Sequence, residues 1–355
     1  MADRMRVGVL TFHRCINYGS YWQARCLVEA IAARGHDAVL LDHHSRDVTS
    51  REWRYAFQPL TPDRSSRADV AQYGRKLRKF VETFDTLPLS APFDLDDPGA
   101  MPPVDLAVIG SDEVLNLSHP WYGGKPIFWG DGIPAPRVVT YAASFGNYAA
   151  PDVEPEWTAR LQELDAISVR DDNSRGIVAQ ATGREPAMVL DPVLLNPPQV
   201  EPADGDPYLL VYGHHIPIWF ADRVQDAARV RGLRLISVGY RNDWADEQRL
   251  DAGPQEFAAL VAGAQAVATT YFHGCCFALL NGKPLACAPS DYRWTKVRDL
   301  TALLAAERHL TFEDRDPADV GALLSEPVSG AVQARIADLR AHSSAWLDAA
   351  LAGRA

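Results

Sequence analysis

The sequence predicts an α/β protein with two Rossmann-like lobes that face each other across a central cleft. Short β-type runs alternate with helix-period segments along most of the chain, which is typical of parallel α/β architecture. The 355 residues, of which 47% are hydrophobic, exceed the usual size of a single core. The stretch 196–207 is rich in proline and acid and lacks an apolar period. We therefore expect domains at 1–200 and 201–355.

The first domain is expected to open on a strand and to alternate from there. Runs of β-type residues bounded by turn residues predict strands at 6–12, 38–42, 105–110, 137–142, 166–170 and 187–191. Segments with helical periodicity predict helices at 21–34, 66–84, 156–164 and 173–182. Residues 85–103 show neither pattern, and we expect a surface loop there.

The alternation restarts after the linker. Apolar runs predict strands at 208–212, 233–238, 266–270 and 284–288, and helical periods predict helices at 219–231, 254–264 and 275–281. A final helix is expected at 329–351, where it can cross back to pack on the first domain. No internal repeat or low-complexity tract interrupts this order.

Composition and charge exclude several classes of partner. The 35 basic and 46 acidic side chains leave a formal charge of −11, and no Lys/Arg-rich run appears, so nucleic acid is not an expected partner. The first residues do not resemble a secretory signal peptide, and no segment approaches the ~20 apolar residues of a membrane span. We expect a cytoplasmic protein without integral membrane association.

The five cysteines indicate neither a disulfide framework nor a zinc site. Their number is odd and they lack CxxC spacing, so we expect reduced thiols. Cys275 and Cys276 stand at a predicted helix start, where the helix dipole can stabilise a thiolate. Packing as small buried residues is the favoured alternative for both.

The most informative stretch is Val267 to Pro284, VATTYFHGCCFALLNGKP. An apolar run breaks at Tyr271, Phe272, His273 and Gly274 and gives way at once to a helix-like segment. This order places an imidazole at the carboxyl end of a buried strand, where open α/β sheets bind ligands. His273 is therefore the leading catalytic candidate, and a core histidine is the alternative.

The first strand is followed by a second candidate group. Asn17, Gly19 and Ser20, with Tyr18 between them, can form a turn whose backbone N–H groups hold an anion together with the helix dipole. The sequence is neither GxGxxG nor a Walker motif, which argues against a standard dinucleotide or P-loop site. An ordinary strand-to-helix turn capped by Ser20 explains it equally well.

Two further strand ends carry polar residues. At the first, which includes Ser111, Gly110 permits close backbone approach, and the carboxylates of Asp112 and Glu113 and the amide of Asn116 can bind sugar hydroxyls or orient a catalytic group. Ser144 follows the next strand and can donate to an anion. In each case helix capping or turn packing is the alternative.

Arg170 ends another strand, and its guanidinium suits carboxylate or phosphate recognition. An internal salt bridge to Asp171 or Asp172 is the alternative. His214 and His215 follow a strand in the second domain and are expected to point into the cleft. Adjacent histidines rarely chelate one ion, and neither a metal nor a tightly held cofactor is indicated.

The order of these groups resembles the polysaccharide pyruvyl transferase family. NYG, then GSDEVLN, YAASFG, SVRDDNS, LDPVLL, PQEF and the FHG segment occur in that order, from residue 8 to about residue 285. The resemblance implies a GT-B-like fold and transfer of a pyruvyl group from phosphoenolpyruvate to sugar hydroxyls, commonly as a cyclic ketal. It implies no metal.

The resemblance also assigns roles to residues. It gives His273 the acid/base role, and Arg170 and the turn from Asn17 to Ser20 can hold the donor's anionic groups. The predicted catalytic residues are His273, Arg170 and Asp112. The predicted substrate-binding residues are Asn17, Tyr18, Gly19, Ser20, Gly110, Ser111, Asn116, Ser144, His214, His215, Tyr271, Phe272, Gly274 and Cys275.

One departure from the family pattern bears on the donor. Tyr271 stands where members commonly have serine or arginine, and Cys275 where threonine is frequent. Tyrosine cannot supply the charge of an arginine. A GT-B-like group or glycosyl transferase with another activated donor, and a non-catalytic ligand-binding homologue, are therefore the alternatives. The acceptor is not specified by the sequence, and a homo-oligomer is possible.

Overall fold

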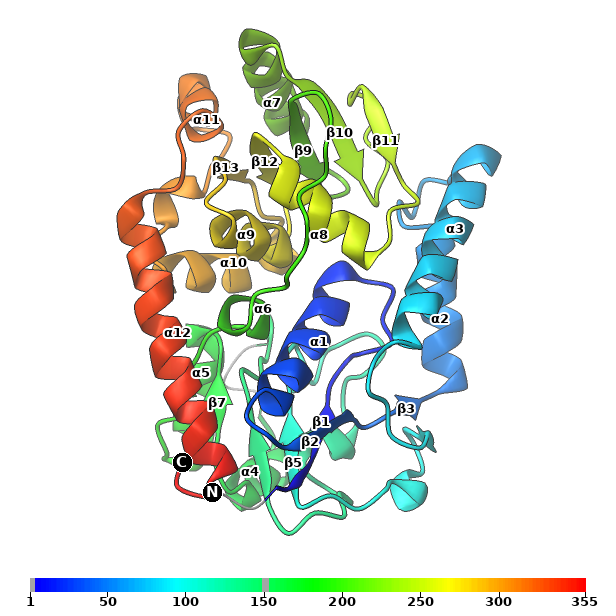
Figure 1. Ribbon diagram of the computed structural model, residues 1–355, viewed down its shortest axis with the longest axis vertical. Coiled ribbons are helices and arrows are strands. Elements are labelled where there is room, and N and C mark those ends of the chain that lie inside the picture. The colour runs from blue at the N-terminus through cyan, green and yellow to red at the C-terminus, as the bar shows by residue number, and fades with distance from the viewer. Residues whose placement is uncertain (1–3, 149–152) are drawn as a thin grey trace. The chain divides into compact units, whose positions relative to one another are not determined.

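The computed structural model describes residues 4–148 and 153–355 and divides the chain into two compact units (Figure 1). The first unit contains the segment up to Glu52, Phe84–Pro197 and the residues from Ala337 onward. The second contains Trp53–Thr83 and Pro198–Ile336. Both units are built on parallel sheets with helices on their faces, which confirms the predicted α/β class.

The first unit is centred on a parallel sheet in the order β2-β1-β5-β6. Its strands are β1 Arg6–Leu10, β2 Asp37–Leu40, β5 Leu106–Ile109 and β6 Val138–Thr140. Parallel bridges at Val139–Ala166 and Ala143–Val169 continue the sheet toward the paired strands β7 Ser168–Val169 and β8 Ala187–Met188. Each of these strands matches one expected from the sequence.

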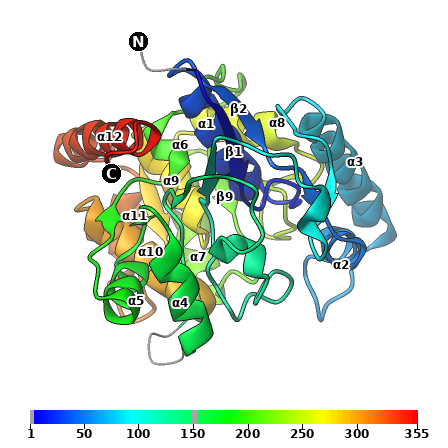
Figure 2. The same ribbon diagram turned by 90° about the horizontal axis from the view of Figure 1, so that it is seen from below.

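Helices that follow its strands along the chain pack on this sheet. They are α1 Tyr18–Ala32, α4 Pro155–Glu163, α5 Asp172–Thr182 and the single turn α6 Pro192–Leu195. The last part of α12 Gly330–Leu351 lies beside α6 (Figures 1 and 2). There Arg340 donates to the Leu194 carbonyl at 2.7 Å, and Ser343 accepts from the Leu190 amide at 2.9 Å.

The second unit has a five-stranded parallel sheet in the order β11-β10-β9-β12-β13. Its strands are β9 Tyr208–Tyr212, β10 Arg234–Val238, β11 Glu247–Arg249, β12 Ala266–Thr269 and β13 Leu285–Cys287. The central strand β9 reads YLLVY and is buried throughout, as expected for a strand covered on both faces. The carboxyl end of β9 therefore lies between the helices that cover the two faces of the sheet.

One face of this sheet is covered by α7 Ile218–Arg231 and α11 Pro317–Leu323, whose apolar side chains pack against Leu209 and Val211. The other face is covered by α8 Pro254–Gly263 and α9 Phe272–Leu280. There Phe257 packs on Tyr212 with ring centroids 4.7 Å apart. The helix α10 Asp291–Leu303 follows β13.

The segment Trp53–Thr83 is grouped with the second unit although it precedes the linker by more than a hundred residues. It includes most of α3 Arg67–Phe84. Lys76 donates to the Gly239 carbonyl at 3.2 Å, and Arg241 pairs with Asp69 at 2.7 Å. The sequence-based boundary at residue 200 falls in the stretch between α6 and β9.

Several elements were not anticipated. Residues 85–103 are not simply a surface loop, because β4 Phe93–Asp94 pairs with β3 His43–His44 and Phe93, Leu95 and Met101 are buried. The helix α2 Arg46–Phe57, the strand β11 and the helices α10 and α11 were also missed. Within the described ranges, no helix is long and apolar enough to span a bilayer.

Candidate functional site

The sequence-predicted residues gather at the carboxyl ends of the parallel strands in each unit. In the first unit the turn after β5 contains Gly110 at φ 115° and Asp112 at φ 73°. A Cβ on Gly110 would lie 2.4 Å from the Tyr141 carbonyl oxygen, so this glycine is required by the close approach of β6. The turn thereby fixes Ser111 and Asp112 at the sheet edge.

Arg170 lies at the centre of this group and is 3% exposed. Its guanidinium pairs with Asp191 at 2.7 Å and with Asp112 at 3.1 Å, and it donates to the Ser111 hydroxyl at 3.1 Å. Burial opposes the charge, but the two carboxylates outweigh burial, and the pKa of Arg170 lies above its ordinary value. Arg170 thus holds Asp112 and Ser111 in place.

The salt bridge that the sequence offered as an alternative has different partners. Asp171 caps α5 by accepting from the Ser174 amide, and Asp172 pairs with Arg175. Asp191, which follows β8, instead pairs with Arg170 at 2.7 Å. Contact of Arg170 with the donor stays a prediction.

The turn before α1 is organised by Asn17 rather than Ser20. The Asn17 Oδ1 accepts from the Gly19 amide at 2.8 Å and the Ser20 amide at 3.3 Å, which is N-capping geometry. The Ser20 hydroxyl donates to Asp112 at 2.8 Å, and Gln23 donates to Thr11 at 2.9 Å. These hydrogen bonds connect α1 to the turn after β5. The backbone amides of Gly19 and Ser20 already donate to Asn17, so they could bind an anion only by giving up that partner.

Asn116 and Ser144 are buried, at 2% and 0% exposure. Asn116 donates to Glu113 at 2.9 Å, and Ser144 accepts from the Gly146 amide at 2.9 Å. Both side chains therefore brace the loops behind Asp112. Direct ligand contact by either one would require displacement of these internal partners.

In the second unit, α9 begins three residues earlier than expected, with Tyr271 as its N-cap residue. His273 consequently lies in the first turn of the helix, partly buried, with its ring edge-to-face against Phe272 at 5.0 Å. A Cβ on Gly274 would lie 2.2 Å from the Thr269 hydroxyl, so glycine allows α9 to pack closely on β12. This packing fixes the position of His273.

Tyr271 belongs to an aromatic cluster at the same edge of the sheet. Its ring stacks on Tyr212 and Tyr240 with centroid separations of 4.7 and 5.5 Å. The guanidinium carbon of Arg293 lies 4.0 Å from the centroid of the Tyr271 ring. A cation thus reaches position 271 from α10, which sequence reasoning missed.

His214 lines the same cluster, whereas His215 is exposed, with φ 49°. The Nε2 atom of His214 forms a 2.9 Å hydrogen bond with the Tyr55 hydroxyl. Burial, followed by the charge of Arg293, lowers the pKa of His214 to about 3, so its imidazole is neutral at physiological pH. These two adjacent histidines therefore have different environments.

Cys275 is fully buried and forms a hydrogen bond with Cys287 on β13. That hydrogen bond and burial raise the pKa of the Cys275 thiol well above its ordinary value, which opposes a thiolate. The buried, hydrogen-bonded environment therefore favours the packing interpretation of this cysteine over a helix-start thiolate. Substrate contact would require the side chain to leave this environment.

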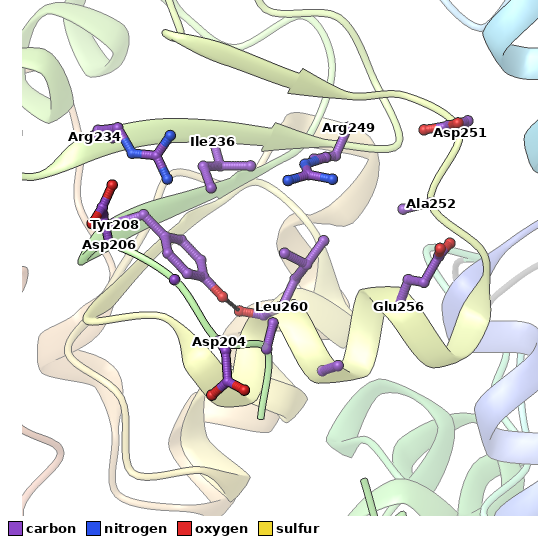
Figure 3. A pocket seen from close by; sticks show the side chains of 13 residues that line it. Asp204, Asp206, Tyr208, Arg234, Ile236, Arg249, Asp251, Ala252, Glu256 and Leu260 are labelled. Atoms are coloured by element: carbon purple, nitrogen blue, oxygen red, sulfur yellow. Dashed lines mark hydrogen bonds between the residues drawn. The ribbon is translucent and has the colours of Figure 1, made fainter. Parts of the chain in front are cut away.

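A pocket of about 280 Å³ lies elsewhere on the second unit, between α8, β10 and the linker (Figure 3). Tyr208 and Arg234, the first residues of their strands, stand at one end, and the Tyr208 hydroxyl donates to the Leu260 carbonyl at 2.7 Å. Among its charged side chains, Arg234 pairs with Glu247 and Glu256 with Lys79. It contains none of the sequence-predicted site residues.

Comparison with known proteins identifies one sequence family. The model of the family described as "Polysaccharide pyruvyl transferase" matches residues 17–292, which include both groups of strand-end residues. No curated protein sequence matches the chain significantly.

Solved structures share the fold at low sequence identity. UDP-GlcNAc 2-epimerase from Neisseria meningitidis, bound to UDP-GlcNAc, is 10% identical with a TM-score of 0.51, covering 96% of this chain and 99% of that one. Anabaena HepE, in complex with UDP and glucose, is 10% identical with a TM-score of 0.49, covering 98% and 100%. The epimerase confirms the GT-B-like fold class.

Proposed function

Because the chain belongs to the polysaccharide pyruvyl transferase family, we propose that it transfers a pyruvyl group from phosphoenolpyruvate to the hydroxyls of a sugar-containing acceptor. The family makes it a transferase that modifies carbohydrate. The family match over residues 17–292 is the observation on which the proposal rests. The donor and ketal formation are the parts that require experiment.

The reaction balances without a metal or redox partner. One proton is added to the methylene carbon of phosphoenolpyruvate, which leaves an electron-poor carbon bearing the phosphate and carboxylate. A sugar hydroxyl forms a C–O bond to that carbon and loses its proton, and the C–O bond to phosphate breaks. Addition of a second hydroxyl, with loss of its proton, closes a cyclic ketal and leaves inorganic phosphate.

His273 is proposed as the group that moves the proton. An imidazole can both give and accept a proton near neutral pH, which suits a reaction that needs one proton at carbon and releases others from oxygen. The first turn of α9 and the close packing at Gly274 hold the ring at the carboxyl edge of the sheet. That edge is where open parallel sheets bind ligands.

Asp112 and Arg170 are proposed to act in the first unit as a fixed pair. Asp112 is held by Arg170 and by the Ser20 hydroxyl, and is 8% exposed. Its carboxylate is suited to accept a hydrogen bond from an acceptor hydroxyl. Arg170, at 3% exposure, is proposed to position Asp112 as well as to contribute positive charge to the donor site.

The test is phosphate release from phosphoenolpyruvate in the presence of a panel of free sugars, nucleotide sugars and oligosaccharides. Wild type is expected to release phosphate with one acceptor class. His273→Ala should reduce kcat by at least about 100-fold, the usual contribution of acid/base catalysis. His342→Asn, an exposed histidine on α12, is the matched control and should retain wild-type rates.

A glycosyl transferase with a nucleotide-sugar donor is the second candidate. It is favoured by the fold shared with an epimerase that binds UDP-GlcNAc. Release of nucleotide from a nucleotide sugar, with no phosphate release from phosphoenolpyruvate, would replace the first proposal by this one. We also propose a cytoplasmic location, which is supported by five buried cysteines that form no disulfide in the described part of the chain.

A further inference from the structure

Three neighbouring strands of the second unit end at one place. The sheet order β9-β12-β13 is parallel, so the carboxyl ends of these strands share one edge. His214 follows β9, Tyr271 follows β12, and Arg293 comes from the first turn of α10 after β13. Topology therefore brings together three side chains that are far apart in sequence.

Arg293 is held in place by Tyr271 and Ser290. Its guanidinium lies over the Tyr271 ring at 4.0 Å, and one nitrogen donates to the Ser290 hydroxyl at 3.1 Å. Within residues 4–148 and 153–355, no carboxylate lies within ion-pair distance of it. A guanidinium that lies over an aromatic ring can still donate its N–H groups to a planar or tetrahedral anion.

The position of Arg293 in its helix has a local cost. A cation in the first turn opposes the helix dipole, an effect of about 0.3–1 kcal/mol at exposed sites. The carboxylate of Asp291, in the same turn, interacts favourably with the helix dipole. Helix stability therefore does not account for Arg293, whereas an anion bound at this helix start would interact favourably with both the arginine and the dipole.

The surroundings of Arg293 are basic and aromatic. The Nδ1 atom of His214 is buried, with no hydrogen-bond partner among the described residues. Lys76 lies over the Tyr240 ring at 4.8 Å, and burial lowers its pKa to about 7. The positive charges of Arg293 and Lys76 act on His214 and help to lower its pKa.

We propose that Arg293, together with His214 and Lys76 of the same aromatic cluster, forms a subsite that binds the phosphate group of the donor. The subsite supplies from α10 the cation that position 271 lacks. The identity of the donor rests on the proposed function. The charge and position of the subsite rest only on the geometry of the second unit. The shared chemistry is a phosphate group, carried by phosphoenolpyruvate or by a nucleotide.

The experiment is calorimetric titration of the full chain with phosphoenolpyruvate, inorganic phosphate and UDP. Arg293→Met removes the charge but keeps an apolar stem over Tyr271, and Arg293→Lys keeps the charge without the planar group. Arg298→Met is the matched control, because it removes one positive charge from the same helix. We expect Arg293→Met to weaken binding at least about tenfold, Arg293→Lys to lose less, and Arg298→Met to stay within about twofold.

The outcomes separate the two proposals. Equal binding of a probe by wild type and Arg293→Met overturns the subsite, and so does a wild type that binds none of the probes at millimolar concentration. Binding of UDP or phosphate but not phosphoenolpyruvate, with loss in Arg293→Met, keeps the subsite and overturns the donor. If Arg293→Met unfolds at a different temperature from wild type, the titration of Arg293→Lys tests the subsite instead. Wild-type affinity in Arg293→Lys would overturn the requirement for a guanidinium.

Discussion

Glu52 is a carboxyl group buried beside the turn that leads into α1. It is 6% exposed and accepts from the Ile16 amide at 3.2 Å. Burial raises its pKa from 4.5 to about 7, although hydrogen bonds with Cys15 and Ile16 act in the opposite direction. Such a group is protonated in the folded chain at a pH where the unfolded chain has released the proton.

The free energy of unfolding should therefore fall as pH rises from about 4.5 to about 7. Because the folded pKa is the higher one, the stabilising contribution of Glu52 is fully present below about pH 4.5 and is lost as pH rises to about 7. Glu52→Gln has no carboxyl group to ionise and so lacks this loss. Its free energy of unfolding, relative to that of wild type, should therefore rise by about 2 kcal/mol from pH 5 to pH 8. Urea unfolding at both values measures it, with exposed Glu29→Gln as control. A pH-independent difference would contradict the assignment.

Residue types at strand ends were predictable from the sequence, but their partners were not. His273, Asp112 and Arg170 were singled out because polar residues directly follow apolar runs. Asp191 was predicted only as the end of the strand 187–191, although it pairs with Arg170 at 2.7 Å. Arg293 was missed because a lone arginine near a helix start carries no periodic signal. Pairing across strands depends on sheet order, which spacing along the chain does not reveal.

The turn between β5 and Asp112 is the element that most directly fixes the first group of site residues. Elements with a clear period were predicted closely, and β9 was predicted at both ends. The strands β3 and β4 have two residues each and β11 reads EQR, so none offers an apolar alternation to detect. Short polar elements formed by tertiary contacts leave little signal in the sequence.

Two glycines with positive φ test the requirement at the β5 turn. Gly110→Ala places a methyl group 2.4 Å from the Tyr141 carbonyl oxygen, whereas Gly35→Ala, at φ 89°, meets nothing within 4 Å. We expect Gly35→Ala to cost about 1–2 kcal/mol from backbone strain alone and Gly110→Ala at least about 2 kcal/mol more. Chemical denaturation compares the two. Equal losses would show that the turn can relax around a side chain.

The chain passes between the two units four times, at 52/53, 83/84, 197/198 and 336/337. The crossing at 197/198 lies in the proline-rich, aperiodic stretch 196–207, which the sequence predicts as a linker. The crossings at 52/53 and 336/337 fall inside α2 and α12, where helical periodicity continues without a break. Unit boundaries inside a regular helix cannot be located from periodicity.

Hydrogen exchange can test whether α3 belongs cooperatively to the second unit. Lys76, Lys79 and Arg75 on α3 contact the Gly239 carbonyl, Glu256 and Asp251 of that unit. The amides of Arg67–Phe84 should therefore open with the same free energy and urea dependence as those of β10 and α8. Opening together with β1 and α1 instead would assign α3 to the first unit.

The guanidinium of Arg293 above the ring of Tyr271 bears on how relatives of this chain should be compared. A column-by-column alignment scores position 271 as having lost a basic residue. Two residues 22 positions apart can place charge at the same point in space, so their substitutions are informative only as a pair. Relatives with arginine at the position of Tyr271 are expected to tolerate a neutral residue at the position of Arg293, and the reverse.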